Sequence, residues 1–349
     1  MTRRTRYFLI GSSLVLIVGL CTGLVAYYNG ALPLRTSTVG PEELAYVPGS
    51  TTAVAFANVH DVMNSEFRQK LRQAFPTGEE KDKIQTEIGV DIEHDIDTVT
   101  AGFTGVSAPD GKTAVVLVRG KFDDNRIESV ATQHGGAAEQ YKGKKVIVMS
   151  DHGGASGDRS DAGAVAFLEP GLLALGSAAS VRLAVDAAAT GENVTKNAEL
   201  MKYVGELTGR NTVWAVGHLE GSLADSGLPQ QAKDQLAAIQ WFTANLHVDG
   251  GVSGVVRAIA RDDKAAENLR DVVRGGLAAA HLMAGHDTRL DAVVNSVQVT
   301  GTGNDVAVSF TVPPEILDMI NGLAGMHNLQ KGPKPPAEPK APAPVKKGL

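Results

Sequence analysis

Cysteine is almost missing from this chain of 349 residues, because Cys21 is the only one and it lies in an apolar stretch near the start. The rest of the chain therefore has no disulfide, no thiolate nucleophile and no cysteine-based metal site. Aromatic residues make up only 5% of the sequence, so the core must consist mainly of Val, Leu, Ile and Ala. Burying such side chains contributes about 25 cal/mol per Å², which is enough for a core in a chain of this length.

Recognised catalytic signatures are lacking as well. The sequence contains no H-E-x-x-H, no G-x-S-x-G, no phosphate-binding loop and no Cys/His ligand set. These absences favour a non-enzymatic protein without a cofactor.

Charge is unevenly divided along the chain. The net charge is −6, yet the first six residues hold three arginines and residues 331–349 hold five lysines against one glutamate. The part between the two ends is therefore strongly acidic. Such a region binds nucleic acid poorly, because neutralising phosphates dominates that affinity. We expect no nucleic-acid partner.

The start of the chain has the pattern of a membrane anchor. Three arginines precede 22 uncharged residues, 7–28, which as a helix would span about 33 Å. The positive-inside rule places the N-terminus in the cytoplasm and the remainder outside the cell membrane. A cleaved signal peptide is the alternative, but Cys-Thr-Gly at 21–23 is a poor cleavage site. We expect an uncleaved anchor in 1–30, followed by a linker in 31–45.

The other end of the chain is rich in Pro, Lys and Ala. Residues 326–349 include KGPKPPAEPKAPAPVKKGL and cannot bury a core, so we expect a solvated, disordered tail of polyproline-like character. A sharper interpretation is contact between its lysines and an anionic envelope polymer.

Between these ends, one pattern is written twice. KTAVVLVRGKFDDNRIESVA (112–131) and VSGVVRAIARDDKAAENLRD (252–271) each combine an apolar strand, two aspartates and a helix. Residues 51–60 likewise resemble 211–220, and we match 164–170 with 305–315. We predict an α+β fold of two repeat units, 46–208 and 209–325. Each unit would be β-α-β-β-α-β-β, with antiparallel sheets and helices on one face.

The paired aspartates invite a metal-binding or catalytic interpretation. They recur at the start of a helical pattern in both copies, without a neighbouring His or Ser constellation. An aspartate there accepts hydrogen bonds from unpaired backbone N–H groups. We therefore predict helix caps at Asp123, Asp124, Asp262 and Asp263.

An acidic stretch, GVDIEHDIDTV (89–99), offers candidate metal ligands. They are Asp91, Glu93, His94 and Asp95, and carboxylates with an imidazole suit several divalent ions. The spacing matches no calcium loop, however. The alternating acids, with Ile92, Ile96 and Val99 between them, fit a solvated approach to a buried strand better, so we assign no metal site.

A Gly/Ser/Asp-rich loop, SDHGGASGDRSDAG (150–163), occurs in one copy only. Composition favours a plain hairpin connection. If the loop has a catalytic or binding role, its candidate residues are Asp151, His152, Ser156 and Asp158.

Three segments resemble a group of N-terminally anchored bacterial extracytoplasmic proteins catalogued as a domain of unknown function. They are YVPGSTTAVAFANVHDVMNSEFRQKL (46–71), GVDIEHDIDTVTAGFTG (89–105) and LLALGSAASVRLAVDAAATGENVTKNAELMKYV (172–204). The resemblance implies membrane association and an outward-facing domain, and it supplies no catalytic residues.

These observations favour a membrane-anchored binding or scaffolding protein of the cell envelope, with an envelope protein or peptide as its partner. One alternative is a metal-assisted hydrolase that uses the 89–97 acids together with the 150–163 loop. Another is an accessory subunit of a transport or secretion assembly, contacted through Gly19 and Gly23 of the anchor.

Overall fold

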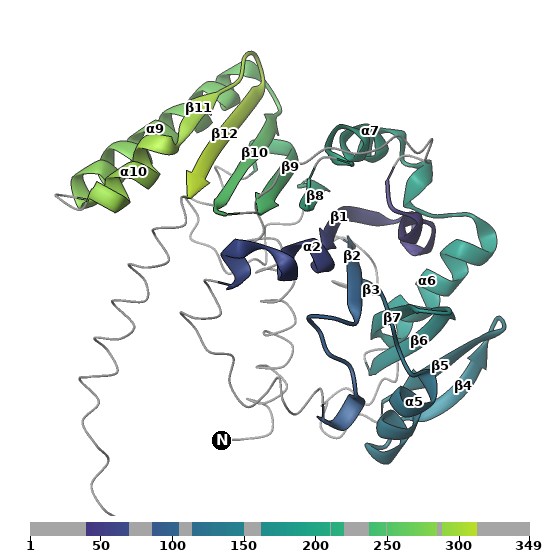
Figure 1. Cartoon of the computed structure of the whole chain (residues 1–349). Helices are drawn as coiled ribbons and strands as arrows, with labels where there is room; N and C mark the ends of the chain where they lie inside the picture. The colour runs from purple at the N-terminus through teal and green to yellow at the C-terminus, as the bar shows by residue number, and fades with distance from the viewer. Residues whose placement is uncertain are drawn as a thin grey trace, which may run out of the picture.

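The structure is a computed structural model of the whole chain (Figure 1). It describes residues 40–69, 86–104, 114–149, 162–209, 211–219, 237–248, 250–284 and 288–312. The expected anchor at 7–28, most of the 150–163 loop and the tail lie outside the described residues. So do residues 313–325. Within the described part of the chain, no helix is long and apolar enough to cross a membrane.

Strands dominate the described chain. They are β1 (Thr51–Asn58), β2 (Ile96–Thr104), β3 (Ala114–Gly120), β4 (Ala137–Tyr141), β5 (Lys144–Val148), β6 (Gly163–Glu169), β7 (Leu172–Ser177), β8 (Val213–His218), β9 (Ile239–Val248), β10 (Val252–Ala260), β11 (Gln298–Thr300) and β12 (Asp305–Val312). The helices are η1 (Glu42–Tyr46), α2 (Val59–Asn64), α5 (Asp124–Gln133), α6 (Ala178–Thr190), η2 (Val194–Lys196), α7 (Ala198–Leu207), α9 (Asp263–Ala284) and α10 (Thr288–Ser296).

All these strands belong to one 12-stranded sheet, in the order β11-β12-β10-β9-β8-β1-β2-β3-β7-β6-β5-β4. Every pairing in it is antiparallel. The sheet runs from the β11–β12 end, beside α9 and α10, to the β4–β5 hairpin at the other (Figure 1). The α+β class with antiparallel strands is therefore confirmed.

The first and second parts of the chain meet at β1 and β8, near the middle of the sheet. Ala55 pairs with Ala215, flanked by the pairs Val54–Val216 and Phe56–Trp214. Separate sheets for the two units, as the sequence suggested, do not form. Instead, hydrogen bonds between β1 and β8 join both parts into one sheet.

The two faces of the sheet carry different helices. The first face bears Val54, Leu117 and Trp214, which share one large core with residues of η1, α6 and α7. The second face bears Ala57 and Ala260: Val62 of α2 packs near the former, and Ala265 and Ala266 of α9 against the latter. The helix α5 also lies on the second face. In β5, Val146 points into the first-face core, so the neighbouring Lys145 points to the second face. Lys145 donates to Glu128 of α5, which places this helix on that side.

The prediction of helices on one face is therefore wrong. The sequence contained the physical reason, since β3 reads AVVLVRG without alternation. Val115 and Leu117 are buried on the first face, while Val116 and Val118 are buried on the second. A strand that is apolar on both sides needs cover on both sides.

The sheet order also corrects one strand match made from the sequence. The strand beside β3 is β7, and the strand beside β10 is β12. Residues 164–170 form mainly β6, which lies one place further out. By position in the sheet, 305–312 therefore corresponds to β7 and not to 164–170.

Candidate functional site

The acidic stretch 91–95 forms a tight turn that leads into β2. The backbone N–H groups of His94 and Asp95 both donate to the carbonyl of Asp91, at 3.1 and 2.7 Å. Two carboxylates close the turn further: Asp91 Oδ1 accepts from the Glu93 N–H at 2.9 Å, and Asp95 Oδ2 accepts from the Asp91 N–H at 2.8 Å. These acids therefore satisfy backbone donors of their own turn.

The remaining side chains of the turn point to separate partners. Glu93 Oε1 accepts from Arg68 Nη2 at 2.6 Å, and both of these side chains are largely buried. His94 Nδ1 lies 2.9 Å from Asp91 Oδ2, with the imidazole 75% exposed. Among the described residues, no group of three His, Cys, Asp or Glu side chains is placed to hold a metal ion. The structure thus brings His94 to Asp91 but directs Glu93 toward the guanidinium of Arg68.

The four aspartates at the helix starts occupy equivalent positions in α5 and α9. Asp123 Oδ1 accepts from the backbone N–H of Arg126 at 3.1 Å, and Asp262 Oδ1 accepts from that of Ala265 at 2.7 Å. Asp124 and Asp263 are the first residues of the two helices, where a negative charge favours the helix dipole. In each pair, the first aspartate is the capping residue.

A first arginine cluster lies where η1 meets the first face of the sheet. Arg119 Nε of β3 donates to Glu43 Oε1, and its Nη2 lies 3.8 Å from Glu169 Oε2. The Tyr46 hydroxyl donates to Glu169 Oε1 at 2.7 Å. The Glu43 side chain is only 6% exposed and is paired with Arg119. Burial, together with the nearby Glu169 carboxylate, raises the pKa of Tyr46 to about 12.

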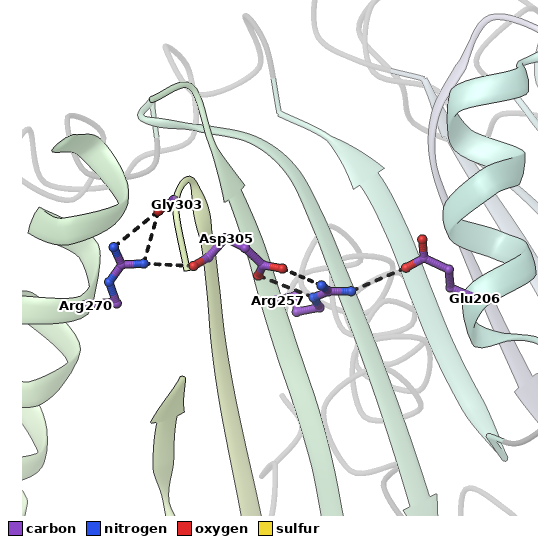
Figure 2. Close-up of polar contacts among 5 residues, drawn as sticks. All are labelled: Glu206, Arg257, Arg270, Gly303 and Asp305. Atoms are coloured by element: carbon purple, nitrogen blue, oxygen red, sulfur yellow. Dashed lines mark hydrogen bonds and ion pairs between the residues drawn. The ribbon is translucent and has the colours of Figure 1, made fainter. Parts of the chain in front are cut away.

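A second arginine cluster joins α7, β10 and β12, also on the first face (Figure 2). Arg257 of β10 donates from Nη2 to Asp305 Oδ2 and from Nε to Asp305 Oδ1, the latter at 3.4 Å. Its Nη1 lies 3.4 Å from Glu206 Oε2 of α7. The hydrogen bond to Asp305 raises the pKa of Arg257 above its ordinary value. One guanidinium therefore links a helix to two neighbouring strands.

The backbone of the same region is held by Arg270 of α9 (Figure 2). Its guanidinium donates to the Asp305 carbonyl at 2.9 Å and to the Gly303 carbonyl at 3.3 Å. Arg270 is 8% exposed, so these carbonyls satisfy donors that are largely shielded from water. The turn before β12 is therefore fixed by α9 from one side and by Arg257 from the other.

Neither cluster was predictable from the sequence, because its members are far apart along the chain. Arg119 and Glu43 are separated by 76 residues, and Arg257 and Asp305 by 48, so no local spacing links them. One signal was present nonetheless. Each arginine interrupts an otherwise apolar strand, VVLVRG or VVRAIA, and a charge in such a strand requires a partner.

The chemistry of these clusters is that of structural ion pairs. A guanidinium stays protonated and offers donors only, and each one here is matched to carboxylates or carbonyls of the chain. The arrangement holds helices on the sheet and neutralises the charges that it buries. Asp151, His152, Ser156 and Asp158 lie outside the described residues.

Comparison with known proteins adds little. No protein family matches the chain, and no curated protein matches it. A solved structure, crystal form I of TP0453, is similar over 83% of this chain and 99% of that chain, at 9% identity and a TM-score of 0.44.

Proposed function

We propose that the chain is a membrane-anchored, extracytoplasmic binding or scaffolding protein of the bacterial cell envelope, without catalytic activity. In this proposal residues 7–28 span the membrane, with the N-terminus in the cytoplasm. The observation that supports it is that the arginines on the sheet and on α9 form structural contacts within the chain. The guanidiniums of Arg119, Arg257 and Arg270 bond to carboxylates or carbonyls of the chain, so these charges hold helices and turns on the 12-stranded sheet.

We further propose that the globular part arose by duplication of one α+β unit. Two observations support this. The connected run β1-β2-β3-β7-β6 matches β8-β9-β10-β12-β11 in order of pairing, and α5 and α9 both follow the third strand onto the second face. The match of 51–60 with 211–220 makes Ala55 equivalent to Ala215, and these two residues pair with each other. A twofold axis between related units requires such a self-pairing at its centre.

In a scaffold of this kind, partners contact the surface of the sheet-and-helix body or the two ends of the chain. The five lysines of 331–349 give the tail a charge suited to an anionic envelope polymer. An envelope protein or peptide is the partner expected for the body itself. The linker expected over 31–45 is too long, because residues 42–45 belong to η1 and Leu44 is fully buried in the first-face core. In this proposal residues 31–39 connect the body to the anchor.

The test is crosslinking in native membranes, followed by purification and mass spectrometry. The full chain is compared with a chain that ends at Gly325, and with a matched chain of full length in which the five tail lysines are replaced by glutamine. A scaffold predicts a partner enriched in stoichiometric amount. Loss in both variants assigns the contact to tail charge, and loss in the truncated chain alone assigns it to tail length.

Two other results would contradict the proposal. Turnover of ester, glycan or phosphate substrates by the purified full chain would favour the hydrolase alternative, above all if EDTA abolished it. A partner that is lost when Gly19 and Gly23 are replaced by leucine, and is unaffected by the tail, would favour an accessory subunit held through its anchor.

A further inference from the structure

One large apolar side chain within the sheet is open to water. Val256 of β10 lies between two hydrogen-bonded strands, opposite Ala244 of β9 and Val308 of β12, yet it is 42% exposed. Among the described strands, no other large apolar side chain is as exposed. Val252, four residues earlier, belongs to a cluster on the second face. Side chains alternate along a strand, so Val256 lies on the second face as well.

Val256 is part of an apolar surface, called the β10 patch below. Its members are Ala244, Val256, Val308 and Phe310, and all but Val256 are partly buried. The ring of Phe310 lies over Gly254, where a methyl group would come within 3.3 Å of it. Burying apolar area contributes about 25 cal/mol per Å², so cover over this patch would stabilise the fold.

Two helical segments pack beside the β10 patch, one at each end of it. Phe67, which follows α2, packs in the cluster that contains Val252. Ala266 of α9 packs in the cluster that contains Val306. The patch lies between these two clusters along the same strands, and Val256 remains exposed there.

The first face of the same strands is polar. Ser253 of β10 pairs with Thr311 of β12, and Ser309 lies on the same side. Arg257, also on this face, is bonded to Asp305. An apolar segment that reaches this end of the sheet can therefore be buried on the second face but not on the first.

The chain continues from β12 at the edge of the β10 patch. Val312, the last residue of β12, packs against the second-face cluster that contains Val252. Two prolines follow it, and proline ends strand pairing but suits the first turn of a helix. The strand in the corresponding sheet position, β7, is likewise followed directly by a helix, α6, which packs on the sheet. A helix is therefore expected after β12.

Residues 315–326 have the sequence pattern of an amphipathic helix. At 3.6 residues per turn, the apolar residues fall on one half of the circumference and the polar ones on the other. The main apolar residues are Ile316, Leu317, Met319, Ile320 and Leu323, and the polar ones include Glu315, Asp318 and Asn321. Twelve helical residues span about 18 Å, and four strand residues from 312 back to 308 span about 13 Å. The apolar half is thus long enough to span the patch.

We infer that residues 314–326 form a helix that folds back from the end of β12 and covers the β10 patch with its apolar half. A segment tethered beside the patch binds it intramolecularly, which gives it an advantage over a lipid or a second copy of the chain. The inference does not depend on the function proposed above. It places the start of the basic tail, 331–349, beside the second face of the sheet.

The test is disulfide formation within the full chain in its own membrane, with Cys21→Ser removing the native thiol. Val256→Cys is combined in turn with Ile316→Cys, Ile320→Cys or Leu323→Cys, all on the apolar half. A disulfide needs Cα atoms within about 7 Å. On oxidation, at least one of these double variants is expected to lose both free thiols while its band stays at the mass of the monomer.

The matched controls combine Val256→Cys with Asp318→Cys or Asn321→Cys, on the polar half of the same segment. Neither control should crosslink. Equal crosslinking in the controls would overturn the inference, because random collision would then explain it, and so would absence of a crosslink at all three apolar positions. A crosslinked band of twice the monomer mass would overturn it as well, since the segment would then cover another copy.

A second measurement does not depend on disulfide geometry. The alkylation rate of Val256→Cys is compared with that of the same chain carrying Ile320→Asp and Leu323→Asp. The thiol should react faster in the second chain, whereas Asn321→Asp, which adds charge on the polar half, should leave the rate unchanged. Equal rates in all three chains would overturn the inference. Slow labelling throughout would assign the cover to lipid or another partner, and fast labelling throughout would show that the patch stays open.

Discussion

The two ends of the sheet are built with similar connections but are packed differently. Around β3, β6 and β7, a large first-face core includes Leu117, Leu168 and Leu172, all almost fully buried, under η1 and α6. Around β10 and β12, the cluster under α9 consists mostly of alanine, with Val306 as its largest buried member. Smaller side chains bury less apolar area, so apolar packing under the helix contributes less at this end, where the buried Arg270 also contacts carbonyls of the turn before β12. The comparison teaches that one strand order can be stabilised by different means at its two ends.

The largest effect should come from the strand junction on which both ends depend. Trp214 of β8 is 1% exposed and stacks on Phe56 of β1, with ring centroids 5.6 Å apart. Trp214→Ala should lower the free energy of unfolding by about 3–5 kcal/mol, because it removes a buried aromatic side chain and leaves a cavity. Urea denaturation of the full chain in detergent measures this change. Val256→Ala, at a 42% exposed position, is the control, and a similar loss there would contradict the packing described.

A smaller loss should follow disruption of the first arginine cluster. Arg119→Met leaves the Glu43 carboxylate buried without its guanidinium, which should cost about 1–3 kcal/mol. The double variant Glu43→Gln/Arg119→Met should lose less than the sum of the two single variants, because neither unpaired charge remains. Denaturation curves of all three variants test the coupling, and strict additivity would show that the pair contributes little.

The helix caps allow a comparison of the two ends at equivalent positions. Asp123→Ala and Asp262→Ala should each lower stability by about 1 kcal/mol, because each leaves a backbone N–H of the first turn without its acceptor. Asp124→Ala provides a control within the first turn and should cost only a few tenths of a kcal/mol through the helix dipole. Thermal unfolding suffices for the measurement. Equal losses from Asp124→Ala and Asp123→Ala would argue against a specific capping role.

The smallest effect should come from the second arginine cluster. The side chain of Arg257 is 40% exposed and that of Glu206 is 43% exposed, so water and salt screen this pair. Arg257→Met should cost about 0.2–1 kcal/mol, and raising the salt concentration should reduce the difference from the unaltered chain. The loss at Arg119 should change less with salt, since Glu43 is buried. If salt reduces the stability loss of Arg119→Met and Arg257→Met equally, the difference in burial between the two clusters has no energetic consequence.

Local features of the fold were predictable because they depend on neighbouring residues. The strands of 51–60 and 252–260 follow from apolar patterns, and the starts of α5 and α9 follow from aspartates that precede helical patterns. The short edge strand β4, AAEQY, was missed because its side chains are mostly exposed and show no apolar alternation.

Features that depend on distant residues were not predictable. The turn at 91–95 could be recognised as acidic, but the contact of Glu93 with Arg68 spans 25 residues and leaves no local pattern. The same holds for Arg119 with Glu43 and for Arg257 with Asp305. The presence of helices on both faces of the sheet was indicated by the unbroken apolar run of β3. Other strands alternate between apolar and polar residues, which favoured the prediction of helices on one face only.

The junction between β1 and β8 has a consequence for how the chain folds. β1 can pair with β2 early, but its other edge stays open until residues 213–218 have been synthesised. At 5–20 residues per second, this delay is roughly 8–30 s. During that interval the first part of the chain presents unpaired backbone N–H and C=O groups along an apolar strand, which is a template for misassociation. Completion of the sheet is thus a late, long-range step, and factors that shield an open strand edge would act on this chain at that step.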